Sequence, residues 1–151
     1  MTKKRLIYLI AGALGLLLVY VFQFHLDIYS ILFKFQAPER IEYTSDYESI
    51  SNATAFIVNK VFRYLLNDGF AIMIIYALFE EKKYVRFSVW VLLFGLFILL
   101  PAYLAIFLLR PEGFSSMLGH FHRIILNPVL MMMLIPAFYY QKTYVGQSDS
   151  Q

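Results

Sequence analysis

The sequence predicts an all-α membrane protein with four transmembrane helices. Of its 151 residues, 60% are hydrophobic, 19% are aromatic and only 15% are charged, whereas a soluble domain carries roughly a quarter charged residues. The apolar residues fall into long blocks, and about 20 such residues cross a bilayer as a helix. The length and this pattern predict one domain over residues 1–145.

Composition also excludes several functions. The chain has no cysteine, which excludes disulfides, thiolate metal sites and a cysteine nucleophile. The basic residues behind the net charge of +3 flank apolar blocks, and a chain that binds nucleic acid would gather them in a patch. No Gly-rich phosphate loop or serine elbow is present. We therefore expect no catalytic residues, no cofactor and no nucleic-acid partner.

The first predicted span covers residues 6–24, directly after Lys3-Lys4-Arg5. Its apolar part is too long for a signal peptide, and no small-x-small cleavage site follows it. The sequence therefore indicates an uncleaved helix that crosses the membrane. Residues 27–52 are polar with interleaved aromatic residues such as Phe33 and Phe35, which predicts a loop lying on the membrane surface.

The second predicted span covers residues 55–79. Residues 69–79 are purely apolar but too short to cross a bilayer alone. The charged first half of this span therefore lies within or near one membrane interface. A short charged turn at residues 80–86 separates it from a third, uncharged span at residues 87–109, in which Pro101 predicts a kink.

The fourth predicted span covers residues 124–140 and contains Pro128 and Pro136. Residues 146–151 are predicted to be a disordered tail. Four spans place both termini on one side of the membrane. The basic clusters at the start of the chain and in the turn after the second span favour the cytoplasm for that side, because loops rich in Lys and Arg stay inside. Residues 27–52 then form a periplasmic loop of a bacterial inner-membrane protein.

Two segments of the chain resemble each other. Residues 63–85 align with residues 123–145 at an offset of sixty, with identities in nine of twenty-three columns. Both segments run from outside to inside, so a duplicated helical hairpin would be a parallel repeat. The first and third spans do not match in this way. The similarity therefore has two interpretations, a duplication or shared apolar composition.

Each of these segments starts with a polar stripe. Residues at i, i+3 and i+7 share one helix face, and this spacing aligns Lys60, Arg63 and Asn67 in the first segment and His120, Arg123 and Asn127 in the second. An arginine within a span costs ~2.5 kcal/mol or more at the bilayer centre and is a functional candidate. For Lys60, the alternative to a binding role is that its side chain extends outward to the lipid headgroups.

The chemistry of the stripes suits an anion. Asparagine is too short to reach the membrane surface, so Asn67 and Asn127 need hydrogen-bond partners within protein. A guanidinium with an amide one turn deeper can clamp a phosphate or carboxylate. The predicted ligand is thus an anionic lipid headgroup or a peptide carboxylate. Asp68 has a second interpretation, as the internal counter-ion of Arg63 or Arg123.

A metal site is not expected. His120 and His122 stand two residues apart, so they cannot share one helix face, and no carboxylate is adjacent in sequence. The run Met131-Met132-Met133 indicates an adaptable core or helix-contact surface. Metal transport is the alternative interpretation of this run.

The chain resembles the exosortase F system-associated proteins, which are small polytopic proteins of Bacteroidota encoded beside an exosortase. The similarity covers roughly residues 55–142, and its most specific part is the ending from Pro136 to Gln141. It is carried by Phe62-Arg63-Tyr64-Leu65-Leu66-Asn67, by Arg123-x-x-x-Asn127-Pro128, and by Ile135-Pro136-Ala137-Phe138-Tyr139-Tyr140-Gln141.

The resemblance implies a context and no mechanism. Exosortases are membrane transpeptidases that use Cys, Arg and His to process C-terminal sorting signals. This chain has no cysteine, so it is not itself the exosortase. The first hypothesis is a non-catalytic accessory subunit whose Arg/Asn stripes contact the exosortase or the sorting-signal helix. The alternative is a lipid- or small-anion-binding membrane protein that acts as a homo-oligomer.

Overall fold

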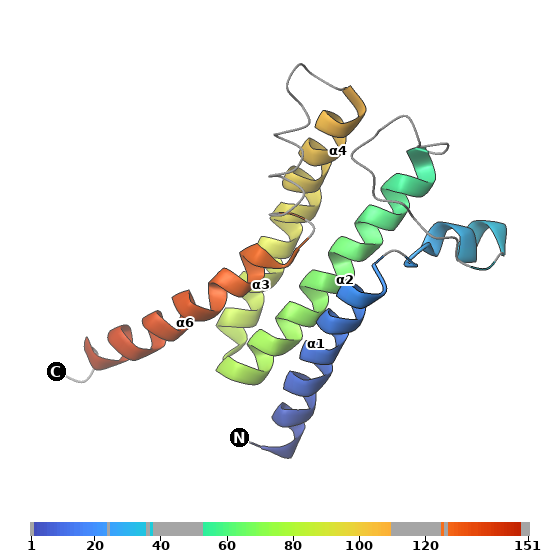
Figure 1. Ribbon diagram of the computed structural model, residues 1–151. Helices are drawn as coiled ribbons and strands as arrows, with labels where there is room; N and C mark the ends of the chain where they lie inside the picture. The colour runs from blue at the N-terminus through green and yellow to red at the C-terminus, as the bar shows by residue number, and fades with distance from the viewer. Residues whose placement is uncertain are drawn as a thin grey trace.

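Three long helices lie side by side and form the body of the protein (Figure 1). In this computed structural model, the described residues are 2–23, 25–35, 37, 53–109, 125 and 127–148. Every element found among them is helical, which confirms the predicted all-α class. The helices are α1 (Lys3–Val21), α2 (Ala53–Phe79), α3 (Lys82–Phe94), α4 (Leu100–Leu109) and α6 (Val129–Ser148), with short π-helical segments η1 (Ser30–Lys34) and η3 (Gly95–Leu99).

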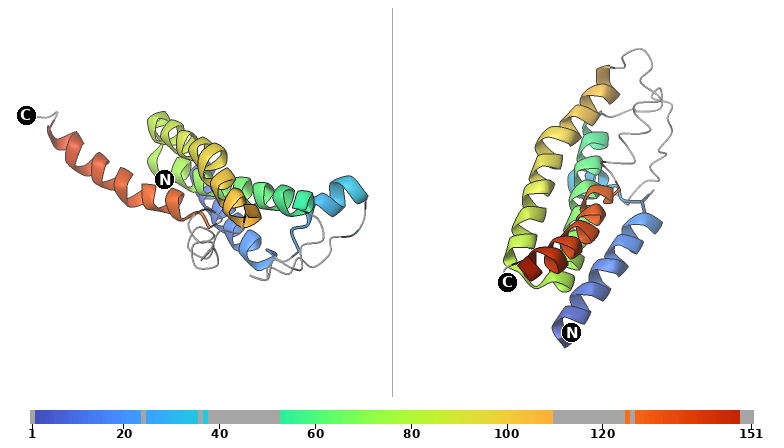
Figure 2. Two further views of the ribbon diagram at one scale, coloured as in Figure 1. Left: turned by 90° about the horizontal axis from the view of Figure 1, so that it is seen from above. Right: turned by 90° about the vertical axis from the view of Figure 1, so that its left-hand side faces the viewer.

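Three helices are long and apolar enough to cross a membrane among the residues that the structure describes. They are α1, α2 and the continuous helix formed by α3, η3 and α4. α2 runs antiparallel to the other two, so its start and its end lie at opposite ends of the bundle (Figures 1 and 2). We call these the α2 N-terminal end and the hairpin end.

Two glycines let α1 approach α2 closely. Gly12 and Gly15 are buried and share one face of α1. A side chain at Gly12 would come within 2.7 Å of the Ile74 side chain and 2.9 Å of the Phe70 carbonyl oxygen, and one at Gly15 would overlap the Phe70 ring. Small residues at helix contacts favour association in membranes because they allow backbones to pack against each other.

The turn between α2 and α3 consists of only two residues. Glu80 takes a left-handed conformation with φ 57°, and Glu81 is extended. α3 begins at Lys82, so most of the predicted turn at residues 80–86 is helical. Arg5 forms a salt bridge of 2.6 Å with Glu80. This ion pair ties the start of α1 to the hairpin end of the bundle.

The third helix changes its hydrogen bonding just before Pro101, where the sequence predicts a kink. In η3 the amide of Leu100 bonds the carbonyl of Gly95, five residues back, in the π-helical pattern. Proline removes a donor and crowds the preceding turn, and a π-bulge is one way in which a helix accommodates such a break.

Tyr64 of α2 is fixed at the start of this π-helical segment. Its hydroxyl donates a hydrogen bond of 2.9 Å to the carbonyl oxygen of Leu92. The approach requires Gly95, because a side chain there would overlap the Tyr64 hydroxyl. Tyr64 is buried in one core cluster with Leu100, Tyr103, Phe107 and Ile125.

α6 runs in the same direction as α2 and diverges from the bundle toward its C-terminus (Figures 1 and 2). Met131 and Phe138 are buried in the second core cluster, which contains Ala71, Ile75, Phe79 and Tyr84. The ring centroids of Phe138 lie 4.6 Å from Tyr84 and 5.7 Å from Phe79. The helix extends to Ser148, into the predicted disordered tail.

One ring contact joins α6 to the end of α2. Phe138 contacts Phe79, and these two residues are fifty-nine positions apart in sequence. This spacing is close to the sixty-residue offset of the sequence alignment. Ile125, which precedes α6, belongs to the same core cluster as Tyr64.

The close approach of α1 and α2 predicts that a large side chain destabilises the protein at Gly12 and not at its exposed neighbour. Gly12→Leu should reduce the free energy of unfolding by about 1–3 kcal/mol, because the new side chain has to displace Ile74 and the α2 backbone. The matched control is Ala13→Leu, since Ala13 is exposed on the opposite side of the same turn. Thermal unfolding in detergent measures both, and equal effects would contradict the proposed contact.

The contact between Tyr64 and Gly95 predicts non-additive effects. Tyr64→Phe should cost about 1 kcal/mol through loss of the hydrogen bond to Leu92. Gly95→Ala should be destabilising in the native chain, because its methyl group meets the hydroxyl, and less so in the Tyr64→Phe background. A double-mutant cycle of unfolding free energies tests this coupling. Strict additivity of the two changes would show that the residues do not touch.

Candidate functional site

The first half of α2 buries an unusual set of polar side chains. These are Asn59, Lys60, Arg63, Asn67 and Asp68, all almost inaccessible. We call residues 59–68 the polar half of α2 and residues 69–79 its apolar half. Ionisable residues within a membrane span are costly and mark functional sites by default.

Lys60 and Arg63 are the basic members of this set, and their charges are costly to bury. Only 2% of Lys60 and 3% of Arg63 are exposed, so Lys60 does not extend outward as the snorkelling interpretation would have it. Arg63 donates a hydrogen bond of 2.8 Å from Nη2 to Oε1 of Gln23. The Lys60 ammonium lies 5.0 Å from the centroid of the Phe56 ring, a favourable cation–π distance. Both residues make further contacts within the protein.

The two cations lie one helical turn apart, and like charges at this spacing repel each other. Burial strengthens the repulsion, because the surrounding dielectric constant is low. Such an arrangement is stable only where oxygen atoms or negative charges compensate it. The buried carboxylates of Asp27 and Asp68 supply two such negative charges. The polar half of α2 thus combines ammonium, guanidinium and amide donors, which suit carboxylate, phosphate or amide oxygens, with internal counter-charges.

A hydrogen-bonded clasp closes the polar half toward the α2 N-terminal end. The Asn59 side chain donates to Oδ1 of Asp27 at 2.9 Å and accepts from the backbone amide of Tyr29 at 3.0 Å. The same Asp27 oxygen accepts from the amide of Ser30 at 3.1 Å, as a helix N-cap does. Asp27, Ser30 and Asn59 are buried. The clasp holds the chain that follows α1 against α2.

Asn67 and Asp68 form the deepest polar level. Asp68 is buried one turn after Tyr64 on the same helix. The Tyr64 hydroxyl donates to the carbonyl oxygen of Leu92, so this level of α2 is joined to α3 just before the π-helical segment. Asn67 is buried and makes polar contacts within the protein, as its short side chain requires.

The structure places only one residue of the second polar stripe. Asn127 is half-buried just before α6. His120 and Arg123 lie outside the described residues. Whether the two stripes meet, which the sequence leaves open, is therefore not answered by the described residues.

Polar side chains give way abruptly to apolar ones along α2. Beyond Asp68, the side chains that α2 buries are those of Ala71, Ile74, Ile75, Ala77 and Phe79. Residues 69–79 extend for about 15 Å at 1.5 Å per residue. In the described part of the bundle, this apolar half separates the cations from the hairpin end. The polar region is thus one-sided.

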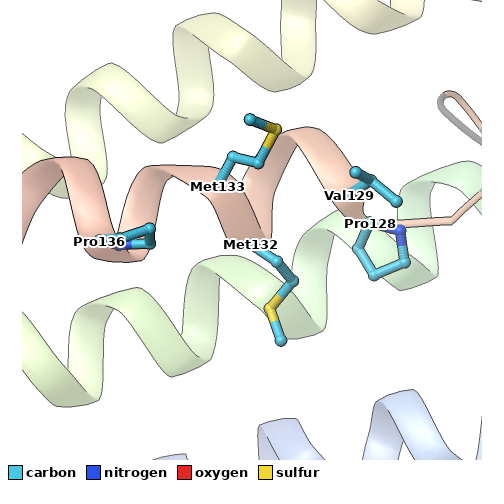
Figure 3. A pocket seen from close by; sticks show the side chains of 5 residues that line it. All are labelled: Pro128, Val129, Met132, Met133 and Pro136. Carbon is cyan, nitrogen blue, oxygen red and sulfur yellow. The ribbon is translucent and has the colours of Figure 1, made fainter.

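The methionine run does not converge on one point. Met131 is buried against α2, whereas Met132 and Met133 leave opposite sides of α6 (Figure 3). These two line an open apolar pocket of about 390 Å³ together with Pro128, Val129 and Pro136. No group of His, Asp and Glu that could hold a metal ion occurs in the described ranges. Of the run, Met131 is the member that packs in the core against α2.

Sequence reasoning missed four members of the site: Gln23, Asp27, Asn59 and Tyr64. Asn59 could have been predicted from the sequence, because residues 59, 63 and 67 follow each other at intervals of four and share one helix face. Gln23 and Asp27 come from the segment after α1. Their proximity to α2 depends on tertiary packing, which no local spacing reveals.

Comparison of the chain with protein-family models, with curated proteins and with solved structures yields no match. The function therefore has to be argued from the geometry of the site and from the resemblance in the sequence.

The clasp predicts a strong coupling between two distant residues. Asp27→Ala and Asn59→Ala should each destabilise the protein, and the double variant should lose about 0.5–3 kcal/mol less than the sum, because both remove the hydrogen bond between the two side chains. Asp27→Ala combined with Leu78→Ala is the additive control, since Leu78 lies in the apolar half and is exposed. Additivity in both pairs would disprove the clasp.

Proposed function

We propose that this chain is a non-catalytic recognition subunit of a membrane protein-sorting system. Its polar half of α2 would bind an anionic or amide-bearing group of a partner. The observation that carries the proposal is the burial of Lys60 and Arg63 side by side at one end of an apolar bundle. Burying two cations in a span costs several kcal/mol, a cost that partner recognition explains.

The one-sided arrangement favours recognition over transport. A transport pathway needs polar or ionisable groups through the whole membrane depth. Here they stop at Asp68, and the buried side chains of residues 69–79 are apolar. A site with this shape can receive a group from one side of the membrane and does not pass it on.

The proposed orientation has four spans, with both termini in the cytoplasm of a bacterium. α6 then serves as the fourth span, and the α2 N-terminal end faces the periplasm. The concentration of Lys3, Lys4 and Arg5 at the start of α1 supports this orientation. Lys60 and Arg63 would lie in the outer leaflet, at the depth where a sorting-signal helix ends.

The partner is proposed from the resemblance to exosortase F system-associated proteins. Arginine binds carboxylates through two parallel hydrogen bonds, and buried amides hold the neighbouring peptide group. The ligand would be a carboxylate or backbone segment of the exosortase or of the sorting-signal helix. Catalysis would remain with the exosortase.

A second function is favoured by a separate observation. An open apolar groove of about 730 Å³ lies between the ends of α2 and α6, lined by residues that include Leu78, Ile135, Tyr139 and Tyr140. Such a groove suits an acyl chain. It lies about 22 Å along α2 from Arg63 at 1.5 Å per residue, so a phosphate bound by the cations would be a separate anion. This alternative is a lipid- or anion-binding homo-oligomer. Native mass spectrometry distinguishes a homo-oligomer with retained lipid from a one-to-one complex with an exosortase.

The proposed function predicts a specific loss of binding. Arg63→Ala should weaken recovery of the exosortase complex by about 30-fold or more, since removing one partner of a buried charged pair costs 2–5 kcal/mol. Arg63→Lys should restore only part of it, because lysine lacks the planar fork. Affinity co-purification from membranes measures these effects, with the amount of inserted protein as reference.

Leu65→Ala is the matched control for this experiment. Leu65 lies at the level of Arg63 on the same helix, and it is exposed. Its replacement should leave complex recovery unchanged. Normal recovery with Arg63→Ala, at normal insertion, would show that the buried cations have a structural role only.

A further inference from the structure

The segment that follows α1 exposes a run of large apolar side chains. η1 occupies Ser30–Lys34 and is followed by Phe35. Ile31, Leu32 and Phe33 are 43–64% exposed, and Phe35 is 91% exposed. Exposed apolar residues occur singly on any protein, but a contiguous group of this kind marks a contact with a membrane or a partner.

The run is held in a defined position. The clasp formed by Asp27 and Asn59 fixes the first turn of this segment to α2 through two hydrogen bonds, and a third, from the amide of Ser30 to Asp27, orders the turn itself. Stacking of Tyr29 on Phe33, with ring centroids 5.2 Å apart, orders the following turn. η1 projects outward from the bundle near the α2 N-terminal end, away from the other helices (Figures 1 and 2).

The distance along α2 from this clasp to the hairpin end agrees with the thickness of the hydrocarbon core of a bilayer. The part of α2 from Asn59 to Phe79 is about 30 Å long at 1.5 Å per residue, which equals the hydrocarbon core of a typical membrane at ~30 Å. At the far end of this stretch, Arg5 and Glu80 form the salt bridge that belongs to the opposite membrane surface. η1 therefore leaves the bundle at one boundary of the hydrocarbon core.

We propose that η1 is a membrane-surface anchor seated in the lipid interface. Ile31, Leu32, Phe33 and Phe35 would enter the boundary between headgroups and acyl chains, and the exposed Lys34 would contact lipid phosphates. Because the clasp joins the anchor rigidly to α2, its seating sets the depth of Lys60 and Arg63 just inside the boundary. This role is independent of any sorting partner.

Single-cysteine labelling tests the anchor, because the chain has no cysteine of its own. Phe33→Cys and Phe35→Cys, labelled with an environment-sensitive dye, are reconstituted in phosphatidylcholine–phosphatidylglycerol nanodiscs. Both labels should show blue-shifted emission. A nitroxide placed near the headgroup should quench them more strongly than one at the end of the acyl chain.

Two reference positions calibrate the depth. Ile98→Cys, exposed in the middle of the third helix, should be quenched most strongly by the deep nitroxide, and Lys82→Cys, exposed at the hairpin end, should show emission typical of water. Emission typical of water at both Phe33 and Phe35 would overturn the proposal. So would blue-shifted labels that no lipid nitroxide quenches, since protein would then cover η1.

A second variant separates the anchor from the fold. Phe33→Ser combined with Phe35→Ser should keep the clasp, because Asp27 and Asn59 are unchanged, and should move a dye at Leu32→Cys to emission typical of water. Unchanged quenching of the Leu32 label in this variant would also overturn the proposal.

Discussion

The structure depends on the burial of two cations within a helix that is otherwise apolar. Lys60 and Arg63 share one face of α2 and are almost inaccessible, and a low dielectric makes their charges expensive unless polar groups surround them. The chain meets this requirement with residues from outside α2. Gln23 approaches from the end of α1, and the clasp at Asp27 closes the region toward the α2 N-terminal end. The segment that follows α1 therefore packs on this end of α2 and surrounds the two charged side chains with polar groups.

In the opposite half of the bundle, the side chains that α2 buries are apolar, and the buried hydroxyl of Ser88 in α3 is satisfied by the carbonyl oxygen of Tyr84. Gly12 and Gly15 bring α1 into contact with α2, and the aromatic cluster around Phe79 and Phe138 fills the space between α2, α3 and α6. The tight turn at Glu80 then closes the hairpin. A polar half of α2 followed by an apolar half suits recognition from one side of the membrane. The apolar half stabilises the bundle, and the polar half carries the proposed binding function.

The sequence predicted what depends on local pattern and missed what depends on packing. The apolar blocks gave the helical class, and the spacing of Lys60, Arg63 and Asn67 gave the polar face of α2. The start of α3 at Lys82 was missed, because Glu80 adopts a left-handed conformation that a charged run does not reveal. The contribution of Asp27 was missed because it requires two helices to meet.

The one-sidedness of the polar region is the claim on which this account depends most. In oriented vesicles, Asn67→Cys and Ile75→Cys can be probed with a charged, membrane-impermeant thiol reagent, and the chain offers no competing cysteine. The account predicts that Asn67→Cys, which is buried but lies in the polar half, reacts slowly and only from the side of the α2 N-terminal end. Ile75→Cys, which is fully buried in the apolar half, should react from neither side. Reaction of Ile75→Cys, or reaction of Asn67→Cys from the hairpin side or from neither side, would contradict it.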